Sequence, residues 1–180
     1  MRLREHGLVT DSQQHVWNAS ILLGERQDQE VIEMAEGLGA AGRINTLAAV
    51  AMARIGDRER ALQIAKRALE RRDPWSELTV GRVMEEVGDL DCALVWYERA
   101  AKRMDRERPI RAMGKALLQL GDYGEAAWAL SQSVRMSRYI HDEDIAQLEK
   151  CLRNLGRDKE AAELNAAMGG NLKCEPADVR

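Results

Sequence analysis

The sequence contains no Phe, and only three Pro and three Cys among its 180 residues. Because Pro interrupts helices and strands, so few of them favour long helices joined by short turns. The cysteines, Cys92, Cys151 and Cys174, have no CxxC or zinc-finger spacing, which indicates free thiols and a reducing compartment. The first residues lack the apolar stretch of a secretory signal, and no run approaches the roughly 18 apolar residues of a membrane span. We therefore expect a cytoplasmic location and no membrane contact.

A strong excess of charge of one sign is also missing. There are 27 basic and 30 acidic residues, for a net charge of −3, and this balance argues against general nucleic-acid binding. Two basic clusters do occur: Lys66, Arg67, Arg71 and Arg72, and then Lys102, Arg103 and Arg106. No aromatic residues interleave with them to stack on bases, so we interpret them as cations that complement the negative ends of helices.

What the sequence has is an internal repeat. Four glycines, each preceded by Ile, Val or Leu, are 32, 33 and 35 residues apart: Gly56, Gly88, Gly121 and Gly156. Five residues after each Gly stands an Ala, and seven residues before it stand Ala49, Gly81, Gly114 and Glu149 in turn. A period of about 34 residues is typical of paired helices.

The positions around each Gly predict two helices. Those at −7, −4 and −1 share one face of a first helix, and those at +5, +9 and +12 share one face of a second. Small residues at −7 and +5 let the two helices cross closely, and the Gly takes the left-handed conformation that ends the first helix. The Asp that follows three of the glycines, as in Asp57, is placed to cap the second helix.

Two segments carry a resemblance to a known family. The stretches LGDYGEAAWALSQSV (Leu120 to Val134) and VGDLDCALVWYERAAKRM (Val87 to Met104) resemble the tetratricopeptide repeat. The resemblance covers about residues 42–169. The Trp that begins each consensus repeat is missing in most copies, and Asn165 replaces a bulky residue in the last. The resemblance implies an all-α fold, a right-handed superhelical α-solenoid of about five antiparallel helix pairs.

The organisation we expect has four parts. Residues 1–9 form a lead-in, 10–41 a degenerate first repeat, 42–169 the four clear repeats, and 170–180 a polar tail behind Gly169-Gly170, which we expect to stop the last helix. In the first repeat, Trp17 and Gly24 fit the −7 and Gly positions. Its second helix fits only if the turn is about two residues longer, with Asp28 as its cap and Val31 and Ala35 on its apolar stripe.

The resemblance further implies a concave groove, lined by first-helix side chains, that binds a peptide or helix of a partner protein. Its early part is rather apolar (Leu47, Val50, Ala53, Leu78) and its later part basic. Our hypothesis is therefore a partner segment with an apolar and an acidic portion; the alternative is that these are ordinary solvated charges. The residues predicted to contact the partner are Trp75, Leu78, Arg82, Arg108, Arg111, Lys115, Lys150 and Arg153.

The remaining features of the sequence give weaker indications of function. The Lys and Asn that clamp a C-terminal carboxylate in some members would fall on Thr46 and Val50, or on Leu78 and Arg82, and neither pair matches. The acidic run His141-Asp142-Glu143-Asp144 has no second His nearby and indicates a helix start rather than a metal site. Trp96 and Trp128 either fill gaps between repeats or, if exposed, mark a second interface.

We accordingly predict a protein-binding scaffold or adaptor, with no cofactor, no metal and no catalytic motif, and we do not predict an enzyme. One alternative is a small secretion- or assembly-type chaperone, which a partner that is insoluble alone would reveal. The other is a structural protein that assembles with itself, forming homo-oligomers through its solenoid ends, which a mass that grows with concentration would reveal.

Overall fold

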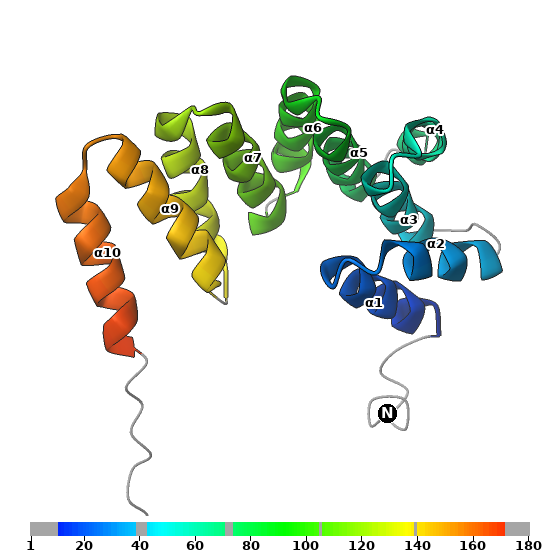
Figure 1. Cartoon of the computed structure of the whole chain (residues 1–180), viewed down its shortest axis with the longest axis horizontal. Coiled ribbons are helices and arrows are strands. Elements are labelled where there is room, and N and C mark those ends of the chain that lie inside the picture. The colour runs from blue at the N-terminus through cyan, green and yellow to red at the C-terminus, as the bar shows by residue number, and fades with distance from the viewer. Residues whose placement is uncertain (1–10, 39–42, 71–73, 105, 139, 172–180) are drawn as a thin grey trace, which may run out of the picture. The chain divides into compact units, whose positions relative to one another are not determined.

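The computed structural model describes residues 11–38, 43–70, 74–104, 106–138 and 140–171. These residues form ten α-helices and no strand (Figure 1). The all-α class predicted from the repeat is confirmed, as is the arrangement in successive helix pairs. The predicted lead-in (1–9) and nearly all of the tail (170–180) lie outside the described residues.

The chain divides into two compact units, Met1–Ala100 and Ala101–Arg180. The helices that begin in unit 1 are α1 (Asp11–Gly24), α2 (Asp28–Gly37), α3 (Arg43–Arg54), α4 (Arg58–Leu69), α5 (Pro74–Val87) and α6 (Leu90–Arg103). Unit 2 contains α7 (Glu107–Leu120), α8 (Tyr123–Met136), α9 (Asp142–Asn154) and α10 (Asp158–Asn171). The last helix continues through Gly169-Gly170, so the prediction that this pair stops it is wrong.

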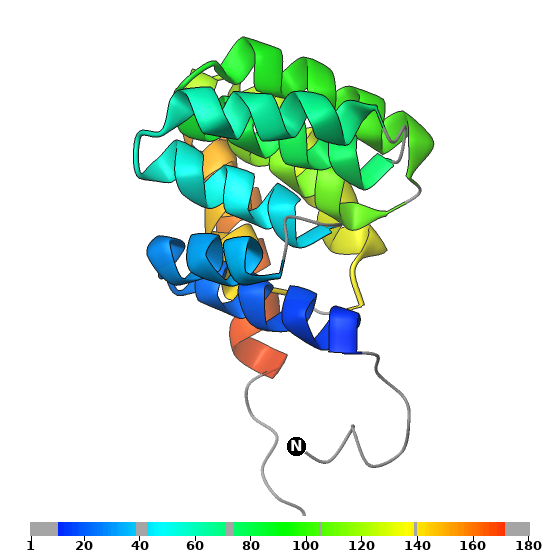
Figure 2. The ribbon, with the colours of Figure 1, turned by 90° about the vertical axis from the view of Figure 1, so that its right-hand side faces the viewer.

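Within each unit every helix packs on its neighbours along the chain. In unit 1, α2 packs on α3 and α4 on α5, and first helices also contact each other, α1 on α3 and α3 on α5 (Figure 2). In unit 2, α8 packs on both α7 and α9, and α9 on α10. This sequential packing is how helix-pair repeats bury a face that one pair alone would leave in water.

The turns follow the predicted chemistry. All four repeat glycines are left-handed, with φ between 71° and 90°. The carboxylate of Asp57 accepts a hydrogen bond from the Arg60 backbone N–H, and Asp89 and Asp122 cap α6 and α8 in the same way. The predicted capping role of these aspartates is confirmed. Of the −1 residues, Ile55, Leu120 and Leu155 are exposed instead of packed, and only Val87 packs against the core.

The core of each pair is the crossing of its two helices. The four Ala at +5 are all fully buried: Ala61, Ala93, Ala126 and Ala161. At the crossing of α5 and α6, a Cβ added to Gly81 would lie 2.4 Å from the Tyr97 ring. At the crossing of α7 and α8, a Cβ on Gly114 would lie 2.9 Å from Leu130. A missing side chain at −7 is therefore what admits a bulky one at +9.

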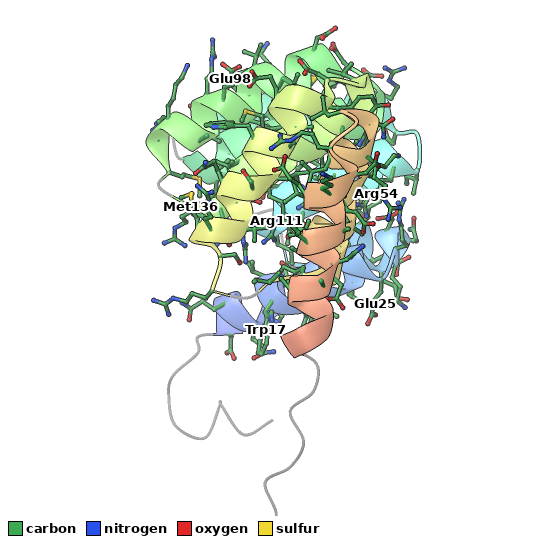
Figure 3. All side chains as sticks on the ribbon, turned by 90° about the vertical axis from the view of Figure 1, so that its left-hand side faces the viewer. Trp17, Glu25, Arg54, Glu98, Arg111 and Met136 are labelled. Carbon is green, nitrogen blue, oxygen red and sulfur yellow. The ribbon has the colours of Figure 1, made fainter. Side chains whose placement is uncertain are left out.

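The first pair also has a left-handed turn residue and a small residue seven positions before it, but at different positions from those predicted. Its left-handed residue is Arg26, at φ 63°, and not Gly24, which ends α1. Seven residues before Arg26 stands Ala19, which is fully buried, whereas Trp17 is 52% exposed (Figure 3). The prediction that Trp17 occupies the packing position −7 is therefore wrong. The left-handed position of this turn is residue 26, two residues after the predicted Gly24, and it was missed because it is occupied by Arg instead of Gly.

Candidate functional site

In unit 1, the predicted groove residues lie on α5 beside α3. The guanidinium of Arg43 stacks over the Trp75 ring, 4.6 Å from its centroid, and Trp75 is half-buried. Leu78, one turn further along α5, is buried, as are Val50 and Ala53 on α3. The expected open apolar stretch is therefore wrong for Val50, Ala53 and Leu78, because all three side chains are buried in the hydrophobic core.

Arg54, at the end of α3, bridges three repeats. Its Nε donates to Glu86 on α5 at 2.7 Å, and its Nη1 donates to the Leu23 carbonyl at 2.8 Å and to Asp28 at 3.3 Å. Burial opposes the charge on Arg54, but the hydrogen bonds and charges of Glu86 and Asp28 raise its pKa above the ordinary value. Arg54 therefore links the C-terminal end of α1 and the start of α2 to α5.

Arg82 on α5 has no such partner. It is half-buried and forms no hydrogen bond or ion pair with the residues that the structure describes. The two nearby carboxylates are engaged elsewhere: Glu85 accepts a hydrogen bond from the Tyr97 hydroxyl, and Glu86 binds Arg54. Burial, with the neighbouring charge of Arg54, lowers the pKa of the Arg82 guanidinium. An arginine nonetheless stays protonated, so α5 carries a poorly compensated cation.

In unit 2, two of the predicted basic residues are held by acids from the next first helix. The Arg111 Nε on α7 lies 2.9 Å from Oδ2 of Asp144, whose side chain is almost fully buried at the start of α9. The Lys115 Nζ lies 3.0 Å from Oε1 of Glu143. The Lys115 hydrogen bond and charge lower the pKa of Glu143.

The Arg111 contact is an ion pair without a well-aligned hydrogen bond. Although its Nε is close to Asp144, the N–H is not directed at an acceptor and is buried without a hydrogen-bond partner. The two groups still attract each other strongly at 2.9 Å, because attraction between opposite charges depends little on the direction of the N–H. Arg111 thus neutralises a buried carboxylate of its own chain.

The remaining predicted cations are on the surface of unit 2. Arg108, Lys150 and Arg153 are exposed, and Arg153 pairs with Glu149 one turn earlier on α9. Arg108 has an interaction of its own, and Lys150 forms no ion pair with the described residues. Among the predicted cations, Arg111, Lys115 and Arg153 therefore form ion pairs, whereas Arg82 and Lys150 form none with the described residues.

The two tryptophans of the second helices differ. Trp96 on α6 packs against the core of unit 1, with Arg99 stacked on its ring at 4.8 Å. It fills a gap, as the first of the two predictions states. Trp128 on α8 is 54% exposed.

Within the described residues, no cluster of three or more His, Cys, Asp or Glu is arranged to hold a metal ion. Among the same residues, no helix has the length and apolar character needed to cross a membrane.

Comparisons with known proteins support the fold. No protein-family model and no curated protein matches the sequence. A solved structure named "MamA AMB-1 P212121" is similar over 94% of this chain and 96% of its own, with a TM-score of 0.60 and 17% sequence identity. MamA is a tetratricopeptide-like protein. The chain therefore has a tetratricopeptide-like all-α fold of helix-pair repeats, and at this identity the likeness concerns the fold alone.

The sequence analysis missed the bridging role of Arg54 and Asp144. A signal for Arg54 was present, since Arg54 and Glu86 hold the same offset of −2 from Gly56 and Gly88 and have opposite charge. Residues at the same offset in successive first helices lie side by side in a stacked array, so opposite charges there predict a bridge. The sequence analysis interpreted Asp144 only as part of an acidic helix start, because nothing in the sequence shows that its side chain turns inward.

Proposed function

We propose that this protein is a scaffold that binds an acidic segment of a partner protein on the α5 surface of unit 1, with Arg82 receiving a carboxylate. The observation that carries this proposal is that Arg82 is half-buried and forms no ion pair with the described residues. Partly desolvating a cation is costly unless an anion neutralises it, and Arg54 and Arg111 both have such an anion within the chain. Glu85 and Glu86 attract Arg82 from nearby, but neither forms an ion pair with it, so a partner's carboxylate would supply the direct contact.

The neighbours of Arg82 suit a protein segment rather than a small ion. Trp75 lies two helical turns before Arg82, roughly 10 Å along the same face of α5, and its ring already stacks with Arg43. Tryptophan and arginine are among the side chains that most often dominate binding energy at protein interfaces. A bound segment would place an apolar side chain at Trp75 and an acidic one at Arg82.

The basic residues of unit 2 are weaker candidates. Charge reversal of Arg111 would leave a second negative charge beside the buried Asp144, so loss of binding in that variant would not separate recognition from folding. Arg82 allows a cleaner test, because no described ion pair is broken when its charge is removed.

The test is capture of partners from native lysate by wild type, Arg82→Gln and Arg67→Gln, with quantification by mass spectrometry. Arg67 is an exposed arginine on α4 and serves as the matched control. We expect Arg82→Gln to lower the amount of captured partner at least tenfold, in line with the ~2–5 kcal/mol lost when one member of a desolvated charge pair is removed. Arg67→Gln should capture as wild type does.

A thermal melt of the same proteins supplies a second readout. Because Arg82 stands beside Arg54 without an acid of its own, Arg82→Gln should melt at or above the wild-type temperature. Lost capture with retained stability would mark a binding residue. Equal capture by Arg82→Gln and wild type would contradict the proposal, and so would a clear fall in melting temperature, which would make Arg82 structural.

A further inference from the structure

The outer face of α1 carries two large exposed apolar side chains, Trp17 and Ile21, and almost no charge. Trp17 is 52% exposed and Ile21, one turn later, is 47% exposed. The other exposed residues along this helix after Asp11 are Gln13, Asn18, Ser20 and Gly24. In a chain with 32% charged residues, Asp11 is the only Asp, Glu, Lys or Arg of α1. Depletion of charge around an exposed Trp is typical of the centre of a protein–protein interface.

The repeat register shows what this face lacks. Ile21 lies five residues before the left-handed Arg26, and the residues five before the left-handed Gly56, Gly88 and Gly156 are Ala51, Val83 and Cys151. These three are fully buried. They belong to α3, α5 and α9, and on each of these helices the second helix of the preceding pair is packed: α2, α4 and α8. No described helix takes that place on α1.

The complementary face is on α10, the second helix of the last pair. Ala162 lies six residues after Gly156 and is exposed. The residues at the same offset in α2 and α8, Ile32 and Ala127, are buried. After Glu163 no charged residue follows within α10, and Asn165, Ala166 and Ala167 are exposed as well. A helix face of small, uncharged side chains accepts the bulky Trp17 and Ile21 of another helix at close range.

We propose that copies of this protein associate head to tail, with α10 of one copy packed on α1 of the next. The contact continues between molecules the arrangement that α2, α4 and α8 have toward the following first helix within one molecule. Such an interface joins two different surfaces, so each copy uses its α1 face in one contact and its α10 face in another, and assembly proceeds beyond a dimer. The inference uses neither Arg82 nor Trp75 and is independent of the proposed function.

The experiment is sedimentation velocity of the whole chain over a wide range of protein concentration. Ile21→Glu places a charge in the α1 face, and Ala162→Arg places a long cation on the α10 face. Val95→Glu is the matched control, since Val95 is an exposed apolar residue of α6. All three positions are solvent-exposed in the single chain, so circular dichroism and melting temperature should stay close to wild type.

We expect the average mass of wild type and of Val95→Glu to rise past twice that of one chain, while Ile21→Glu and Ala162→Arg each remain at the mass of one chain. A mixture of the two single variants should reach twice that mass and stop. In the mixture, the intact α10 of the Ile21→Glu chain can still bind the intact α1 of the Ala162→Arg chain, and no other intact pair remains.

Three outcomes would overturn the proposal. Wild type could stay at the mass of one chain at every concentration. Ile21→Glu could abolish association while Ala162→Arg leaves it intact, which would mean that two α1 faces pack on each other. A chain lacking residues 1–10 could associate where the whole chain does not, which would mean that this segment occupies the α1 face.

Discussion

The turn between α1 and α2 places an arginine where the other turns of this kind place glycine. For a residue with a Cβ, the left-handed conformation costs about 1–2 kcal/mol, because the Cβ approaches the following carbonyl oxygen. Arg26 adopts it at φ 63°. The turn has the backbone hydrogen bonds of the glycine turns, such as Gln27 N–H to the Leu22 carbonyl at 2.9 Å, and Arg54 adds a long-range contact by binding the Leu23 carbonyl and Asp28 on either side of it. The long-range bridge and the strained residue are therefore coupled.

Replacing this residue by glycine should stabilise the protein. Glycine removes the steric cost at position 26 and returns part of the gain through its larger entropy loss on folding, so we expect Arg26→Gly to raise the free energy of unfolding by about 0.5–1 kcal/mol. Urea denaturation measures the difference. Gly56→Ala is the reciprocal control and should lower the free energy by about 1 kcal/mol. A less stable Arg26→Gly variant would show that the left-handed position of the first turn lies elsewhere.

At the scale of elements, the helix pairs before the last one share a matched crossing point. The residue at −7 on the first helix faces the residue at +9 on the second, and their sizes are inversely related: Gly81 with Tyr97, Gly114 with Leu130, and Ala49 with Ala65. In the last pair both positions are polar, Glu149 and Asn165, and Asn165 is exposed. The crossing distance of a pair is thus set by two side chains and not by helix propensity.

The substitution Gly81→Ala tests this fit. Alanine favours a helix over glycine by about 1 kcal/mol, but its Cβ would enter the Tyr97 ring, and overpacking of this kind costs about 1–3 kcal/mol. We expect a net loss of stability in wild type. In a Tyr97→Ala background the obstruction is gone, so the same substitution should become stabilising. An equal effect in both backgrounds, measured by a double-mutant cycle in urea, would contradict the crossing described here.

Between first helices, the bridge from α7 to α9 should depend on pH. Because Lys115 lowers the pKa of Glu143 in the folded state, this carboxylate contributes stability above its unfolded pKa, near 4.5, and loses it as the pH falls through the lower folded value. Glu143→Gln should therefore melt below wild type at neutral pH, and the two should converge below about pH 4.5. The effect is small, since the Glu143 side chain is largely exposed.

Glu163→Gln, an exposed change on α10, is the matched control. Its difference from wild type should stay constant across the same pH range. A Glu143→Gln difference that is equally insensitive to pH would show that the Lys115 pair contributes nothing to stability in solution.

At the scale of the whole molecule, the sequence predicted pairs two to five because their glycines, alanines and capping aspartates each have one structural role. The sequence did not predict the register of the first pair correctly. There Arg26 takes the left-handed position that glycine takes in the other pairs, and Trp17 was wrongly assigned to the core. The sequence also did not reveal which basic residues are neutralised, since that depends on how each first helix is rotated toward the next. Arg82, Arg111 and Lys115 occupy similar positions in the sequence, yet of these three only Arg82 forms no ion pair in the described structure.

The matched sizes at the helix crossings limit how such a protein can be rearranged by recombination. A chimera that joins α3 to α6 would set the Ala49 methyl against the Tyr97 ring, and one that joins α5 to α4 would leave Gly81 facing Ala65 across an empty space. A splice made between pairs keeps every crossing intact. The smallest segment that can be duplicated, deleted or exchanged is therefore a complete helix pair, and the Gly-Asp turn inside it is the least tolerant place for a junction.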